Sequence, residues 1–88
     1  MGEILPADLR AASLGERIRF IRRRLGFSYL ELARRAGIGC NTLTRLERGE
    51  GKAIDAVVGR VVRALGPAVA EAFPGTADVF DLLFPPSS

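Results

Sequence analysis

The side chains best suited to chemistry in this 88-residue chain are arginines, together with one asparagine and several serines and threonines. Guanidinium and amide groups form paired hydrogen bonds with base edges or phosphates. The chain has no histidine and a single cysteine, Cys40, so it offers neither a disulfide framework nor a zinc site of the Cys/His type. It also has no phosphate-binding glycine loop and no cluster of carboxylates. We therefore expect no catalysis, no metal and no cofactor.

The basic residues gather in the middle of the chain. All thirteen Lys and Arg lie between Arg10 and Arg63, together with only five of the ten acids, so a net charge of +3 hides a basic centre and acidic ends. Such a centre attracts polyanions, although a run such as Arg22 to Arg24 is also common on the solvated face of a helix. Charge alone leaves both interpretations open.

The length and hydropathy limit the architecture. A chain of this size with 48% hydrophobic residues suits one compact domain. No apolar run approaches the roughly 20 residues that cross a bilayer, and charged residues interrupt the N-terminal segment where a signal peptide would be apolar. We expect a cytoplasmic protein without membrane contact.

Three short helices are predicted first. A capping box at Ser13–Glu16 starts a helix that ends at Gly26, and the same signature at Ser28–Glu31 starts a second that ends at Gly37. A third helix, Cys40–Glu47, follows a tight link and closes at Gly49. Their apolar residues recur at spacings of three and four and should form the core: Leu14, Ile18, Ile21, Leu25, Leu32, Ala33, Ala36, Leu43 and Leu46.

The rest of the chain predicts two more helices. Apolar residues from Ile54 to Leu65 repeat at helical spacing, and Gly66-Pro67 should end that helix and start a fifth, which runs to about Phe73. We thus expect an all-α, five-helix domain over 13–73. Residues 1–12 would form an N-terminal arm, and 74–88 a short amphipathic tail with a disordered end.

The short link between the second and third helices carries the most specific pattern. A helix-turn-helix needs its second helix to leave the first steeply, and Ala36-Gly37-Ile38-Gly39 permits such a turn. Residues 14–66 resemble the phage-repressor and Cro (XRE-type) family of helix-turn-helix DNA-binding proteins. The resemblance rests on Leu32-Ala33, on Gly37 nine residues after Ser28, on the run Leu43–Gly49 and on Ala64-Leu65-Gly66. It implies a lambda-repressor-like fold and a transcriptional regulator, with repression as the expected role.

The resemblance also implies which residues read DNA. It places the helix Cys40–Glu47 in the major groove of double-stranded DNA, where the base-reading positions are Cys40, Asn41, Thr44 and Arg45. Asparagine can bond adenine, arginine can fork onto guanine, and the threonine methyl can contact thymine. Asn41 and Thr42 could instead cap their helix, because Gly39 has no side chain. Cys40 could instead be a redox-sensitive thiol, since a helix N-terminus lowers thiol pKa.

Other family positions suggest contacts to the DNA backbone, which fix register without reading sequence. They are Ser28, Tyr29, Gly39, Thr42, Arg48 and Lys52. The family usually has glutamine where this chain has Tyr29, a capping Ser or Thr at Gly39, and a basic residue at Glu50, and these departures imply weaker anchoring. Arg22 and Glu47 match a family pair that forms a partly buried ion pair, so their expected role is structural.

One recognition helix buries little surface, so we expect a homodimer that reads two half-sites. The candidate dimer or partner surface consists of exposed apolar residues: Phe20, Val69, Phe73, Val79, Phe80, Leu83 and Phe84. The alternative is a tail that folds back over its own domain. A second functional hypothesis is a protein interaction module of the same fold, an antitoxin or phage-type modulator that acts mainly through a protein partner.

Overall fold

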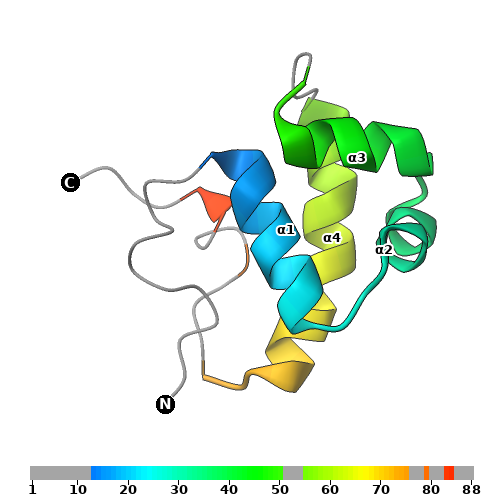
Figure 1. The fold of residues 1–88 in the computed structure, drawn as a ribbon. Coiled ribbons are helices and arrows are strands. Elements are labelled where there is room, and N and C mark those ends of the chain that lie inside the picture. Colours follow the sequence, from blue (N-terminus) through cyan, green and yellow to red (C-terminus); the bar gives the residue numbers. More distant parts are fainter. Residues whose placement is uncertain (1–12, 51–54, 76–78, 80–82, 85–88) are drawn as a thin grey trace.

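The protein is described from a computed structural model that covers residues 13–50, 55–75, 79, 83 and 84. This part contains four helices and no strand: α1 (Leu14–Arg24), α2 (Tyr29–Ala36), α3 (Cys40–Arg48) and α4 (Asp55–Ala72). Figure 1 shows α3 crossing one end of α4, with α1 and α2 on either side. The expectations for the arm 1–12, for Lys52, for Phe80 and for the end of the tail fall outside the described residues.

The start of α1 has the predicted capping box. The Glu16 amide donates to the Ser13 hydroxyl oxygen at 3.3 Å, and the Ser13 amide donates to the Glu16 carboxylate at 3.0 Å. Two backbone N–H groups that the helix leaves unpaired are thereby satisfied. Hydrogen bonds from the Ser13 amide and hydroxyl lower the pKa of Glu16 below its ordinary value.

The start of α2 has only half of the predicted box. The Ser28 hydroxyl oxygen accepts from the Glu31 amide at 3.1 Å. The Glu31 carboxylate pairs with Arg35 one turn further on, at 2.7 Å, instead of reaching back to the cap. An arginine four residues after a glutamate offers a charged donor on the same helix face, and that donor competes with the backbone amide.

The turn between α2 and α3 depends on Gly37, which ends α2 in the left-handed region with φ at 70°. The Ile38 amide then donates to the Ala33 carbonyl at 3.0 Å, which satisfies a terminal carbonyl of α2. A side chain at this φ would be strained, so glycine permits the sharp change of direction. As predicted, the third helix follows directly.

The expected fifth helix is wrong, because α4 continues through Pro67 to Ala72. Proline removes one helical hydrogen bond and crowds the preceding turn, which is why Gly66-Pro67 predicts a break. The buried stripe of Val61 and Leu65 continues to Val69, which is 2% exposed. Packing of that stripe on both sides of Pro67 keeps the helix continuous.

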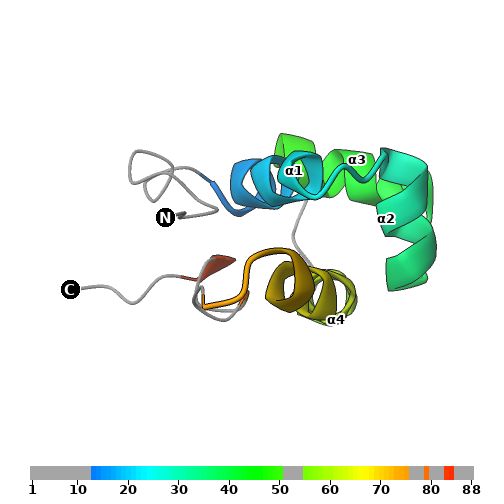
Figure 2. The ribbon, with the colours of Figure 1, turned by 90° about the horizontal axis from the view of Figure 1, so that it is seen from below.

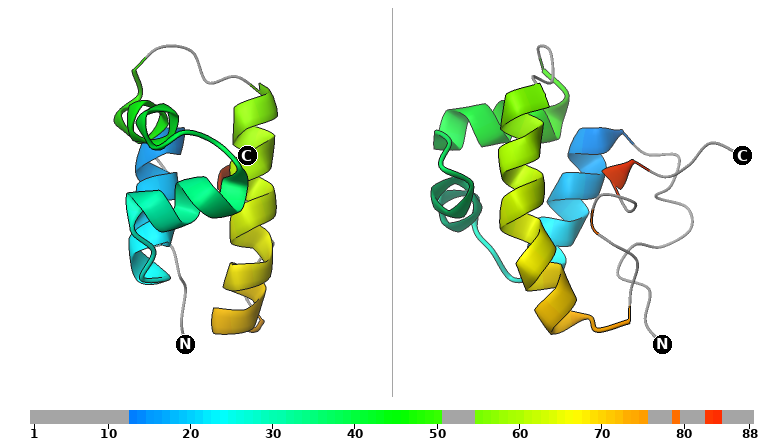
Figure 3. Two further views of the ribbon diagram at one scale, coloured as in Figure 1. Left: turned by 90° about the vertical axis from the view of Figure 1, so that its right-hand side faces the viewer. Right: turned by 180° about the vertical axis from the view of Figure 1, so that it is seen from behind.

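The core lies between α4 and the group formed by α1, α2 and α3. Figure 2 shows these three helices together on one side of α4, and Figure 3 shows the length of α4 from behind. Most of the fully buried side chains are apolar residues predicted from the helical spacing, and Val69 and Leu83, which were expected on an exposed surface, join them. They include Ile18, Ile21, Leu32, Leu43, Val61, Leu65, Val69 and Leu83.

The described part of the tail folds back onto the domain. Val79 is 3% exposed, Leu83 is completely buried, and the Leu83 carbonyl accepts a hydrogen bond from Arg17 Nη1 at 3.0 Å. Figure 1 shows the segment at 83 beside α1. Val69, Val79 and Leu83 therefore lie in the chain's own core and do not form the exposed surface that was expected. Gly66 of α4 lies against Val79, and Arg17 of α1 binds the Leu83 carbonyl, so these two tail residues contact both α1 and α4.

Candidate nucleic-acid interface

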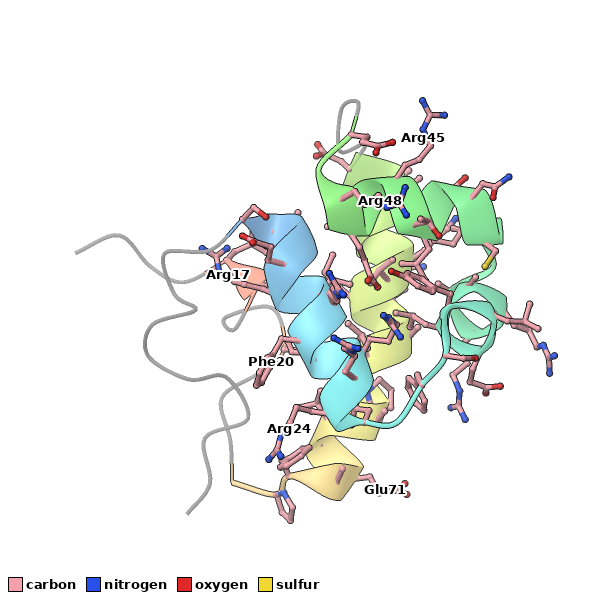
Figure 4. All side chains as sticks on the ribbon, in the orientation of Figure 1. Arg17, Phe20, Arg24, Arg45, Arg48 and Glu71 are labelled. Carbon is pink, nitrogen blue, oxygen red and sulfur yellow. The ribbon has the colours of Figure 1, made fainter. Side chains whose placement is uncertain are left out.

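The outer face of α3 is polar and open. Its buried face consists of Leu43, Leu46 and Glu47, which fall at helical spacing and fix the helix to the core. Asn41, Arg45 and Arg48 are exposed and recur at spacings of four and three, so they share the opposite face. Figure 4 shows Arg45 and Arg48 pointing away from the other helices. Cys40 is exposed with a free thiol, and Thr42 is also exposed.

Thr44 is partly buried at the edge of this face. Its hydroxyl donates to the Cys40 carbonyl at 2.9 Å. This bond to the preceding turn occupies the hydroxyl proton and fixes the rotamer. The Thr44 side chain is therefore held in one orientation, and its methyl group is the part that remains available for an apolar contact.

The N-terminus of α3 has no side-chain cap. Gly39 is the N-cap residue, and no side chain accepts from the first amides of the helix. The alternative in which Asn41 or Thr42 caps α3 is therefore not observed. The unpaired amides of a first turn are favourable partners for an anion such as a phosphate.

The remaining backbone-contact candidates are spread around α3. Ser28 is exposed, and its oxygen accepts from the Glu31 amide, which leaves the hydroxyl proton available for donation. Gly39 is exposed at the start of α3, and Arg48 is exposed at its end. The Arg48 guanidinium lies 4.0 Å from the exposed Glu50 carboxylate, which is a weak pair in water.

Arg22 and Glu47 form the expected ion pair between α1 and α3. Arg22 Nε donates to Glu47 Oε2 at 2.8 Å, and Nη2 donates to Oε1 at 3.3 Å. The residues are 6% and 4% exposed, so this pair is almost wholly removed from water. The fork geometry satisfies both carboxylate oxygens and holds α3 against α1.

Two further contacts of Arg22 bring α2 into this cluster. Its Nη1 donates to the Phe27 carbonyl at 2.8 Å, and its guanidinium lies 4.1 Å from the centre of the Tyr29 ring. Tyr29 is partly buried, and its ring covers the cation that pairs with α3. The residue expected to touch phosphate thus has a clear packing role in the structure.

Gly15 allows α1 and α3 to approach each other, and the sequence pattern did not single it out. A Cβ at this position would overlap the carbonyl groups of Leu46 and Glu47. The backbones of α1 and α3 therefore approach each other closely at Gly15. The available signal was a glycine inside an otherwise regular helical pattern. Glycine lowers the stability of a helix, so its presence there indicates that a neighbouring segment needs the space.

Within the described ranges, no group of three acidic, cysteine or histidine side chains could hold a metal ion. None of the helices seen there is both long and apolar enough to span a membrane. Seven exposed arginines have no ion pair to any described carboxylate: Arg19, Arg23, Arg24, Arg34, Arg45, Arg60 and Arg63. Arg24 instead lies over the Phe73 ring, and Arg60 donates to the Gly37 carbonyl at 3.2 Å.

Comparison with known proteins gives one match. The profile of a family described as a helix-turn-helix domain matches residues 13–72. Searches of curated proteins and of solved structures gave no significant match. The matched segment covers more than half of the chain and contains all four helices. Together with the steep turn at Gly37 and the exposed polar face of α3, it shows that the chain belongs to a helix-turn-helix domain family whose fold is that of DNA-binding regulators.

Proposed function

We propose that this protein is a sequence-specific transcriptional regulator of the phage-repressor and Cro type, which reads the major groove of double-stranded DNA with α3. The observation that carries the proposal is the division of α3 into two faces. Leu43, Leu46 and Glu47 hold it to the domain, while Asn41 and Arg45 stand free on the other side. A helix fixed in this way can enter a groove as a rigid body.

In this proposal Arg45 forks onto guanine O6 and N7, and Asn41 pairs with adenine N6 and N7. Thr44 and Cys40 line the same side and contact the groove through small groups, with the Thr44 methyl suited to thymine. Each good bidentate pair contributes about 1 to 3 kcal/mol of discrimination. Asn41 and Arg45 would therefore supply most of the sequence preference.

Backbone contacts would fix the register of α3. The Ser28 hydroxyl, Arg48 and the uncapped first amides of α3 at Gly39 and Thr42 are the described candidates. Lys52 remains a candidate from the sequence. We assign Tyr29 mainly to packing over Arg22, because its ring lies against that guanidinium. These contacts would hold any sequence equally.

We further propose that the protein acts as a homodimer and as a cytoplasmic repressor, without enzymatic activity. One α3 helix contacts only a few base pairs, whereas two related by a two-fold axis read two half-sites about one helical turn apart. Occupation of such a site would block access by the transcription machinery. The support is the size of the domain and the polarity of α3.

Selection from random DNA tests the base-reading assignment. We expect it to yield a two-fold symmetric site. Arg45→Ala should lose the preference for that site over random DNA, by about 1 to 3 kcal/mol, because a bidentate base contact disappears. Arg48→Gln should weaken selected and random DNA alike. Binding curves for both DNAs at fixed salt measure these effects.

Two results would refute this assignment. The wild-type protein could select no sequence, or Arg45→Ala could weaken both DNAs by the same factor as Arg48→Gln. The mass of the complex on the selected site gives the stoichiometry. A single protein copy on a single half-site would contradict the dimer.

A protein-interaction role is the second candidate, and one surface favours it. A depression of about 490 Å³ on α4 is lined by the apolar residues Val58, Gly59, Val62 and the partly exposed Phe84, and also by Asp55 and Arg63. A partner held there would bind through apolar contacts. Its affinity should change little with salt, whereas DNA binding through several arginines should fall steeply.

A further inference from the structure

The run of three arginines at the end of α1 is divided among three environments. Arg22 is buried in the pair with Glu47, and the Arg24 guanidinium lies 5.2 Å from the centre of the Phe73 ring. Arg23 is exposed and pairs with no described carboxylate. Successive helical residues point about 100° apart, so neighbours in sequence reach different surroundings. The structure gives Arg22 and Arg24 a partner, and leaves Arg23 facing water.

Arg19, one helical turn before Arg23, is in a similar environment. It is exposed, has no ion pair in the described chain, and lies four residues before Arg23. Like charges at this spacing repel and weaken a helix slightly. Glu16 is the only acid in α1, and its carboxylate is bound to the amide and hydroxyl of Ser13. Among the described residues, Arg19 and Arg23 therefore have no counter-charge.

Arg19 lies on the side of α1 that faces α3. Gly15 meets the α3 backbone, and Arg22 reaches Glu47 on α3. Arg19 lies four residues after Gly15 and three before Arg22, so it shares that side of α1 and stands at its solvent edge. Figure 1 shows the first turns of α1 beside α3. The exposed edge of α1 is thus continuous with the proposed DNA-binding surface.

We infer that Arg19 and Arg23 form a second row of contacts to the phosphates of the same duplex, which extends the α3 interface along the DNA backbone. The inference rests on the proposed function. Guanidinium groups match phosphate oxygens in geometry and charge, and remain protonated in all ordinary conditions. Because phosphates are the same in every sequence, these contacts add affinity without adding preference.

The test is the salt dependence of binding to selected and random DNA. Each phosphate neutralised contributes about 0.9 to the slope of log affinity against log salt. The double variant Arg19→Gln with Arg23→Gln should lower that slope by roughly 1.8 and leave the ratio between the two DNAs unchanged. Each single variant should lower it by about half as much.

Arg63→Gln is the matched control, because it also removes one exposed cation that has no ion pair to a described carboxylate. Arg63 belongs to α4, where it lines the depression near Phe84, and not to α1 or α3. It should leave the slope nearly unchanged. Circular dichroism should show that all variants keep the helical content and melting temperature, since none removes an internal contact.

The outcomes separate this inference from the proposed function. An unchanged slope in the double variant overturns the inference, as does an equal drop in Arg63→Gln, which would reflect overall charge alone. If the wild-type protein still selects a site and needs Arg45 for it, the proposed function stands without the second row. If the wild-type protein binds no DNA, both fail.

Discussion

At the scale of single residues, burial decides what each arginine does. Arg22 makes three hydrogen bonds to Glu47 and Phe27 and lies under the Tyr29 ring, whereas Arg23, next to it in the chain, is exposed. A charge held this far from water needs a partner of opposite sign. The Arg22–Glu47 pair therefore has a structural role, which is to hold α3 against α1.

Glu47→Gln should be strongly destabilising, because it leaves the Arg22 guanidinium buried without a counter-charge. We expect the free energy of unfolding to fall by about 3 to 5 kcal/mol, measured by urea denaturation. Glu31→Gln is the matched control, since it breaks the exposed pair with Arg35 and should cost at most about 1 kcal/mol. Equal losses in the two variants would show that burial of the Arg22–Glu47 pair has no special effect.

At the scale of elements, glycines show where helices meet. Gly15 and Gly59 both lie inside helices, and the sequence alone gives no way to rank them. A Cβ on Gly15 would overlap the α3 carbonyls, whereas a Cβ on Gly59 would meet nothing within 4 Å. Gly15 thus sets the distance between α1 and α3, and Gly59 only weakens α4.

Alanine at the two positions should have opposite effects. Gly15→Ala should destabilise the domain by about 1 to 3 kcal/mol, because α1 and α3 must move apart. Gly59→Ala should stabilise it by about 0.5 to 1 kcal/mol through helix propensity. Thermal melts of the two variants measure the difference. A stabilised Gly15→Ala protein would contradict the close approach of α1 and α3.

At the scale of the whole molecule, the tail completes the core. Leu83 is fully buried although it lies eleven residues beyond the end of α4, and Arg17 holds its carbonyl. The apolar pattern in the tail fitted either a dimer contact or a fold-back. The described residues Val79 and Leu83 fold back, while Phe84 remains 39% exposed.

Leu83→Ala should lower the free energy of unfolding by about 2 to 5 kcal/mol, as for other fully buried leucines. Phe84→Ala should cost less, because part of that ring is already in water. Chemical denaturation at several protein concentrations measures both. A loss that grows with dilution would mean that Leu83 packs against a second copy instead of its own domain.

The sequence by itself determined the local elements and the candidate readers. Caps, glycine stops and apolar spacing are local signals, so they predicted α1, α2, α3 and the turn at Gly37, and family resemblance then singled out Asn41 and Arg45. Only the tertiary structure decided the rest. The continuity of α4 through Pro67, the close approach at Gly15 and the return of Leu83 depend on contacts between segments distant in sequence. Packing energies of that kind outweigh local preferences, and a pattern along one chain does not contain them.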